Sequence, residues 1–323
     1  MLNRTLLSGL AAGFFSVCLW GSLPLLRQLT DLPAMMTSVV ALVAAAAVAW
    51  FSAIVVGEPA SRKPDPDMSY WLGGVGALVA ALYLYFAALA WGEPARVTLV
   101  TYLWPVVFVV GANILASSRV SPRVLIGMGI AFIGVMPLIL GDAPDGGQTP
   151  MVAYIFGLLS GCAWAGYSVY LQQAGAIPFR GYARMFAQAA GLALVLHLVL
   201  GEEVRIASST DWLAAALIGT GPYGIAFMTW GLALRKGPTG LMGVLTYIVP
   251  VISALLLVLT GSTEPEPALL LAVLAVAGGA VLIQTGEAQS EPASGSVERE
   301  ADAVGSASVR EAIDRASPEK IQE

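Results

Sequence analysis

Long runs of apolar residues, separated by short polar segments, dominate the chain from residue 6 to residue 284. A helix rises about 1.5 Å per residue, so roughly 20 apolar residues are needed to cross the core of a bilayer. Lipid offers exposed backbone groups no hydrogen-bond partner, so each run is expected to be helical. The pattern predicts ten transmembrane helices, at residues 6–26, 33–56, 70–91, 95–116, 123–140, 151–172, 182–200, 211–233, 239–260 and 267–284.

The composition agrees with an all-α polytopic membrane protein. Hydrophobic residues make up 57% of the 323 residues and charged residues 11%, whereas a soluble domain carries about 25% charged residues. No basic patch is present outside the short loops, so a nucleic-acid partner is not expected and the lipid bilayer is. The chain's two cysteines, Cys18 and Cys162, lie inside apolar runs, where small packing residues are common.

The basic residues predict the orientation of the helices. Cytoplasmic loops of membrane proteins carry an excess of lysine and arginine. With alternating spans, nine basic residues fall on one side and three on the other. The first group is Arg4, Arg62, Lys63, Arg119, Arg123, Arg180, Arg184, Arg235 and Lys236, and the second is Arg27, Arg96 and Arg205. We therefore expect both termini to be cytoplasmic, with the first apolar run retained as an anchor because no clean cleavage site follows it. Residues 286–323 are polar and lack aromatic residues, which predicts a disordered tail.

Two sequence motifs occur twice along the chain. GFFSVCLW at 13–20 and GLLSGCAW at 157–164 both fit G-x-x-S-x-C-x-W, and TYLWPV at 101–106 matches TYIVPV at 246–251. The offsets are 144 and 145 residues, so the chain reads as a duplicated unit of five helices, at residues 5–142 and 150–285. A copied unit with an odd number of spans enters the membrane inverted. Inverted repeats are typical of carriers that work by alternating access, with a substrate site near the middle of the membrane.

The paired five-helix units, the CLWG motif at 18–21 and the prolines of the fourth and ninth spans resemble the drug/metabolite transporter superfamily, with its EamA-type repeats. Within it, the aromatic density of the third, fourth and sixth spans is most similar to the branch of aromatic amino acid exporters. The resemblance covers about residues 5–285. It implies a transporter that exports amino acids across the bacterial inner membrane, with a small-molecule substrate and no cofactor.

Aromatic side chains near the middle of spans are the candidate substrate-binding residues, because a buried phenol or indole needs a hydrogen-bond partner that a polar cavity supplies. Trp20 and Trp164 hold matching positions in the two repeats. Thr98 and Tyr102 are four residues apart and therefore share a helix face. The predicted set is Trp20, Tyr83, Thr98, Tyr102, Trp104 and Trp164, of which Tyr83, Tyr102, Trp104 and Trp164 match the cavity-lining helices implied by the resemblance.

Candidate hinges lie at prolines inside spans, where the ring removes one backbone hydrogen bond and displaces the carbonyl four residues back. Pro105 and Pro250 are near the centres of the fourth and ninth spans. Gly221 and Pro222 are expected to bend the eighth span. Their segment, GTGPYG at 219–224, also fits the dinucleotide motif G-x-G-x-x-G, but no strand precedes it, so nucleotide binding is not expected.

No Asp, Glu, Lys or Arg lies near the centre of a span. An uncharged site suits a zwitterion with an apolar side chain, so we expect export of aromatic or neutral amino acids. The alternative is a drug or lipophilic-cation exporter on the same scaffold, which would bind its substrate by cation–π contacts. A membrane-embedded enzyme is disfavoured, because the spans contain no HExxH, no GxSxG and no facing carboxylate pair. No metal site is predicted, and the sequence leaves the oligomeric state open.

Overall fold

The computed structural model describes residues 4–59, 67–92, 94–140, 149–203, 207–261 and 267–290, and these residues form helices without a β-strand. The first half contains α1 (Arg4–Gly21), α2 (Leu23–Arg27), α3 (Ala34–Val55), the π-helical segment η1 (Tyr70–Gly76), α4 (Ala77–Trp91), α5 (Pro94–Thr101), α6 (Trp104–Leu115) and α7 (Pro122–Leu140). The second half contains α8 (Met151–Gln173), α9 (Phe179–Leu200), α10 (Ser209–Ile218), the π-helical segment η2 (Gly219–Ile225), α11 (Ala226–Lys236), α12 (Thr239–Leu245), α13 (Ile248–Leu259) and α14 (Pro267–Ser290).

The all-helical, membrane-spanning class is confirmed. Within the described residues, eight helical segments are long and apolar enough to cross a bilayer. They are Arg4–Arg27, Ala34–Val55, Tyr70–Trp91, Arg96–Leu115, Met151–Gln173, Phe179–Leu200, Ser209–Lys236 and Thr239–Leu259. Two further apolar helices, Pro122–Pro137 and Pro267–Ile283, are shorter, so the full count of ten spans stays a prediction. Helix α14 continues to Ser290, and the rest of the predicted tail lies outside the described residues.

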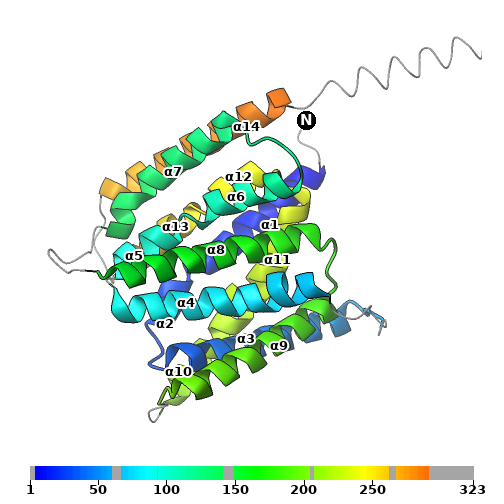
Figure 1. The fold of residues 1–323 in the computed structure, drawn as a ribbon, viewed down its shortest axis with the longest axis vertical. Coiled ribbons are helices and arrows are strands. Elements are labelled where there is room, and N and C mark those ends of the chain that lie inside the picture. Colours follow the sequence, from blue (N-terminus) through cyan, green and yellow to red (C-terminus); the bar gives the residue numbers. More distant parts are fainter. Residues whose placement is uncertain are drawn as a thin grey trace, which may run out of the picture.

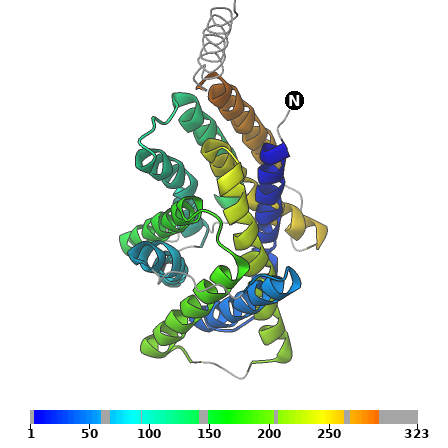
Figure 2. The same cartoon turned by 90° about the vertical axis from the view of Figure 1, so that its right-hand side faces the viewer.

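The helices pack in pairs that join one half of the chain to the other. Helix α1 packs against α11, α4 against α8, α3 against α9, and α7 against α14. The pair α7–α14 lies at one end of the bundle and the pair α3–α9 at the other, with α1, α4, α6, α8 and α11 between them (Figures 1 and 2). Helices α8 and α11 of the second repeat are the counterparts of α1 and α4 of the first. The pair α1–α11 therefore corresponds to the pair α8–α4, while the pairs α3–α9 and α7–α14 each consist of two counterparts.

Helix α1 runs antiparallel to the span that ends with α11. Near the start of α1, a Cβ on Gly9 would lie 2.9 Å from the backbone nitrogen of Gly237, which follows α11. At the other end of α1, the Trp20 indole donates to the carbonyl of Pro222 in η2, at 2.9 Å. Increasing residue numbers in α1 therefore meet decreasing numbers in the facing span.

Helix α8 instead runs parallel to α11. The Trp164 ring lies 5.6 Å from the Phe227 ring, and eleven residues after Trp164 the loop carbonyl of Gly175 accepts from Arg235 at 3.1 Å. Because α1 is antiparallel to α11 and α8 is parallel to it, the first helices of the two repeats point in opposite directions.

The repeated G-x-x-S motif has the same packing role in both copies. The Ser16 hydroxyl donates to the carbonyl of Ala226 on α11 at 3.0 Å, and the Ser160 hydroxyl donates to the carbonyl of Ala81 on α4 at 2.8 Å. In a helical membrane protein, small residues allow close approach and hydroxyl groups bond across the interface. The first copy of the motif thus joins α1 to α11, and the second copy joins α8 to α4.

Candidate functional site

Aromatic rings from four helices meet near the middle of the bundle. We define the aromatic cluster as Trp20 of α1, Trp104 of α6, Trp164 of α8, and Phe227 and Trp230 of α11. The Trp230 ring lies 5.3 Å from the ring of Trp20 and 6.4 Å from that of Trp104. The Phe227 ring lies 5.7 Å from Trp20 and 5.6 Å from Trp164. Phe227 and Trp230 are buried, while the three other rings are half-buried.

Three of the residues predicted from the sequence therefore belong to one cluster. Trp20, Trp104 and Trp164 come from three helices that are distant in sequence, and each touches α11. Edge-to-face and tilted contacts at these centroid distances are the arrangements that aromatic rings prefer, and each holds its partner in a fixed orientation. The half-buried indoles leave part of their surface free for a ligand with an apolar or aromatic side chain.

Span 8 carries the centre of this arrangement and is π-helical at the residues where the sequence predicts a bend. Gly221 and Pro222 lie in η2, the π-helical segment between α10 and α11. Pro222 has no backbone N–H, so it cannot donate to the carbonyl four residues back. The Pro222 carbonyl accepts a hydrogen bond from the Trp20 indole of α1 at 2.9 Å.

Both central prolines coincide with breaks in their helices. The fourth span is split between α5, which ends at Thr101, and α6, which begins at Trp104 and contains Pro105. The ninth span is split between α12, which ends at Leu245, and α13, which begins at Ile248 and contains Pro250. The sequence predicts one span over each of 95–116 and 239–260, with a proline as a candidate hinge near its centre. The structure divides each in two, because the proline ring displaces the carbonyl four residues earlier.

Each break holds a tyrosine. Tyr102 and Tyr247 are 145 residues apart and lie between the two halves of their spans. The Tyr247 hydroxyl is buried without a hydrogen-bond partner among the described residues, and so is the Tyr167 hydroxyl on α8. The Tyr167 ring contacts both Trp164 and Phe227, so that hydroxyl lies beside the aromatic cluster. Unpaired buried hydroxyls are rare, which marks these two as candidate ligand contacts.

The remaining predicted residues are not joined to the cluster by ring contacts. The Thr98 hydroxyl lies 2.8 Å from the Tyr85 hydroxyl, so one of its hydrogen bonds is already made. Tyr83 and Tyr102 are half-buried and pack against the hydrophobic core, and neither makes a ring contact in the described part of the chain. The structure thus assembles three of the six predicted residues around α11 and leaves the other three on the neighbouring spans.

Phe227, Trp230, Tyr167 and Tyr247 are the residues of this region that the sequence-based set omitted. All four lie inside predicted spans, but nothing in the spacing of α11 distinguishes its Phe227 and Trp230 from rings that face lipid. Trp230 is fixed by a hydrogen bond from its indole to the Ser168 hydroxyl at 3.3 Å. The repeat itself was an available signal for Tyr247, which is the counterpart of Tyr102.

No acidic or basic residue belongs to the aromatic cluster, and the described residues contain no group of three or more His, Cys, Asp or Glu that could hold a metal. Charged groups lie toward the ends of the spans. One is Asp67, just before η1. Its carboxylate accepts from the Tyr70 backbone N–H at 2.9 Å and from the Ser69 hydroxyl, and these bonds lower the pKa of Asp67. A surface cavity of about 460 Å³ opens there, beside Asp67, Tyr170 and Gln173.

Comparison with known proteins agrees with this architecture. The model of the EamA-like transporter family matches residues 7–140 and 151–285. The aromatic amino acid exporter YddG of Ancylobacter novellus is 33% identical over 277 residues, which cover 84% of this chain and 94% of that protein. The aromatic amino acid exporter YddG of Escherichia coli is 23% identical over 220 residues, covering 64% of this chain and 74% of that protein.

The fold is also that of a known crystal structure. Its chain superposes with a TM-score of 0.80 and 29% sequence identity, over 88% of this chain and 100% of the other. The chain belongs to the EamA-like transporter family, and the resemblance to the drug/metabolite transporter superfamily is confirmed. It is a multi-pass membrane transporter, and family and relatives indicate transport rather than enzymatic catalysis.

Proposed function

We propose that this transporter exports aromatic and other neutral amino acids from the bacterial cytoplasm by alternating access. Its ten spans form two inverted five-helix repeats, residues 5–142 and 150–285, with both termini cytoplasmic. The aromatic cluster lines the substrate site between them. The meeting of Trp20, Trp104 and Trp164 on α11, without a charged residue among them, is the observation that carries this proposal.

The chemistry of the cluster supports an amino acid substrate. Indole faces pack against an apolar or aromatic side chain, and each such ring contact is worth about 0.5–1.5 kcal/mol beyond the area it buries. The unpaired hydroxyls of Tyr167 and Tyr247 offer hydrogen bonds to the ammonium and carboxylate groups. Two relatives carry the name aromatic amino acid exporter, which points to the same class of substrate.

The opposed directions of α1 and α8 support alternating access. Two copies of one fold that point in opposite directions can exchange conformations, and the exchange converts an inward-open site into an outward-open one. The symmetric breaks at Pro105 and Pro250, together with the bend at Gly221 and Pro222, supply hinges on the spans beside the cluster.

Counterflow in proteoliposomes tests the proposal. Vesicles loaded with unlabelled phenylalanine should accumulate external labelled phenylalanine or tryptophan saturably, while empty liposomes should not. Competition by the twenty amino acids ranks the substrate class. Failure of every amino acid to drive or inhibit counterflow, with uptake of a lipophilic cation such as tetraphenylphosphonium instead, would reject the proposal in favour of a cation exporter.

A further inference from the structure

Helices α3 and α9 lack an N-terminal cap of their own. Each begins directly after a proline, Pro33 or Pro178, and neither proline offers a side-chain hydrogen bond to the first turn. The first backbone N–H groups of a helix have no partner within the helix and carry partial positive charge, so they favour a carboxylate. The two prolines are 145 residues apart, so the same defect recurs in both repeats.

Glu58 supplies the missing cap for α9. It follows the end of α3, and its carboxylate accepts from the backbone N–H groups of Phe179 at 3.1 Å and Arg180 at 2.8 Å. The Arg180 guanidinium completes the junction by donating through Nε to the Glu58 backbone carbonyl at 3.2 Å. The end of α3 is thereby joined to the start of α9.

Glu202 supplies the missing cap for α3. It follows the end of α9, and both oxygens of its carboxylate accept from the backbone N–H of Met35, at 3.2 and 3.1 Å. Nδ1 of the buried His197 lies 2.9 Å from the same carboxylate and fixes its position. The end of α9 is thereby joined to the start of α3, at the opposite end of the pair.

The two caps are copies of one another. Glu58 and Glu202 are 144 residues apart, the offset of the repeated G-x-x-S-x-C-x-W motif. Their backbone partners Met35 and Arg180 are 145 residues apart, like the two prolines, and each is the second residue of its helix. Since α3 and α9 are exchanged by the repeat symmetry, the exchange carries each cap onto the other. The pair therefore has the same contacts before and after the two repeats swap conformations.

We propose that Glu58 and Glu202 are positioning residues that lock α3 and α9 into one rigid strut, which stays paired through the whole transport cycle. This inference rests on the proposed alternating access, because it identifies the part of the molecule that does not rearrange. Separating the two helices at either end would leave the N–H groups of a helix start without their cap. The spans that change packing are therefore the central ones that carry the prolines and the aromatic cluster.

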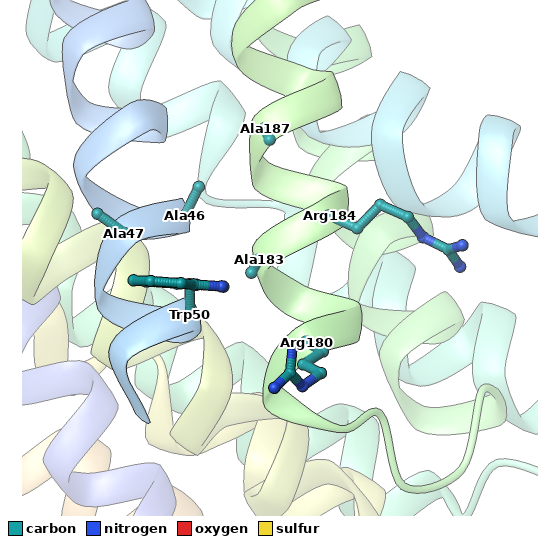
Figure 3. A pocket seen from close by; sticks show the side chains of 7 residues that line it. All are labelled: Ala46, Ala47, Trp50, Arg180, Ala183, Arg184 and Ala187. Carbon is teal, nitrogen blue, oxygen red and sulfur yellow. The ribbon is translucent and has the colours of Figure 1, made fainter. Parts of the chain in front are cut away.

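The faces of the strut allow it to be locked chemically. Figure 3 shows Ala46 of α3 and Ala183 of α9 on facing sides of a groove of about 460 Å³, with Trp50 and Arg180 toward the end near Glu58. Neither alanine belongs to the aromatic cluster. Cysteines placed at both positions can be joined by a short bis-methanethiosulfonate reagent and released again by reduction.

The test compares crosslinked and reduced protein. In a background with Cys18→Ala and Cys162→Ala, the pair Ala46→Cys and Ala183→Cys should show counterflow within about twofold of the reduced protein after crosslinking, because the helices it joins do not separate. A loss of about tenfold or more that reduction reverses would overturn the proposal, since it would mean that α3 and α9 move apart during transport.

Removing the caps gives the complementary result. The double variant Glu58→Ala/Glu202→Ala should lower the maximal counterflow rate by about tenfold while the half-saturating concentration stays unchanged. Crosslinking Ala46→Cys to Ala183→Cys in that variant should restore the rate. Glu203→Ala is the matched control, since Glu203 is exposed and adjacent to Glu202 but makes no cap. Where the alanine variant fails to fold, Glu58→Gln/Glu202→Gln, which keeps an acceptor oxygen without the charge, replaces it.

Thermal unfolding in detergent separates this proposal from the proposed function. If the wild-type protein transports no amino acid, the substrate assignment fails, but the caps are still tested by the melting temperature. The cap-less variant should melt at a lower temperature than the Glu203→Ala control, and crosslinking should recover most of the difference. An unchanged melting temperature in the cap-less variant, or counterflow at the wild-type rate, would contradict the proposal.

Discussion

Trp164 is the residue of the aromatic cluster that is best placed to contact a ligand. Its half-buried ring contacts Tyr167 on its own helix and Phe227, a fellow member of the aromatic cluster, on α11. The sequence marked it through its repeat partner Trp20, although the two residues play different structural roles. The Trp20 indole donates to the Pro222 carbonyl, while the Trp164 indole makes no hydrogen bond within the described residues. Trp164 is therefore freer to contact a ligand than its counterpart.

We expect Trp164→Ala to lower counterflow of labelled phenylalanine by at least about tenfold, since a factor of ten corresponds to ~1.4 kcal/mol, close to one aromatic contact. The loss should appear chiefly in the half-saturating concentration. Trp212→Ala is the control, because Trp212 is 40% exposed on α10 and makes no ring contact with the cluster within the described residues. Equal transport by both variants and the wild type would move the site away from Trp164.

At the scale of single residues, the sequence identified the tryptophans of the cluster and omitted their common partners. Trp20, Trp104 and Trp164 stood out as mid-span indoles. Phe227 and Trp230 are equally apolar, but whether a ring on α11 faces lipid, core or cavity depends on the rotation of that helix about its axis. Tertiary packing sets that rotation, and the π-helical segment η2 before α11 shifts it further.

At the scale of helices, glycine decides how closely α8 approaches the broken fourth span. A Cβ on Gly161 would lie 2.8 Å from the Thr101 carbonyl, next to the break that Pro105 causes. Gly166, one and a half turns further along the same helix, has open space around it. The two positions share a helix and a residue type and differ in their surroundings, so they form a matched pair.

Gly161→Ala should therefore destabilise the protein by about 1–3 kcal/mol, because the added methyl group overpacks the interface with α5 and α6. Gly166→Ala should be neutral or stabilise by up to about 1 kcal/mol through helix propensity. Thermal unfolding in detergent and counterflow measure both effects. Equal melting temperatures for the two variants would show that the contact between α8 and the break is looser than the structure has it.

Helix boundaries were predictable where composition alone sets them and not where packing does. The spans over 33–56, 70–91 and 151–172 correspond closely to observed helices, because loops rich in polar residues end them. The breaks within the fourth and ninth spans were marked by Pro105 and Pro250 as hinges. The sequence did not give the extent of each break, from Thr101 to Trp104 and from Leu245 to Ile248.

At the scale of the whole molecule, the two repeats are related by the way their helices pair. The hydrogen bonds of Ser16 and Ser160 are equivalent under the exchange of repeats, and so are the caps made by Glu58 and Glu202. Such correspondence arises when two copies of one fold face each other across a two-fold axis. In a membrane this axis lies in the plane of the bilayer when the copies are inverted.

Reporter fusions test the inverted arrangement directly. A fluorescent protein fused after Arg123 should fold and emit, because that loop is predicted to be cytoplasmic. Alkaline phosphatase fused after Glu264 should be active, because the corresponding loop of the second repeat is predicted to be periplasmic. Fusions that place both loops on the same side would contradict the inversion and, with it, alternating access by exchange of repeats.

The sequence by itself determined the helical, membrane-embedded class, the duplication and the family, since apolar run length, repeated motifs and proline position are local properties that lipid and backbone chemistry translate directly into helices. The tertiary structure decided which aromatic rings contact α11 and which buried hydroxyls lack a hydrogen-bond partner. It also decided that Glu58 and Glu202 cap helices of the opposite repeat. Those facts depend on the rotation and register of packed helices. Rotation and register are set jointly by side chains from distant parts of the chain, so no local pattern specifies them.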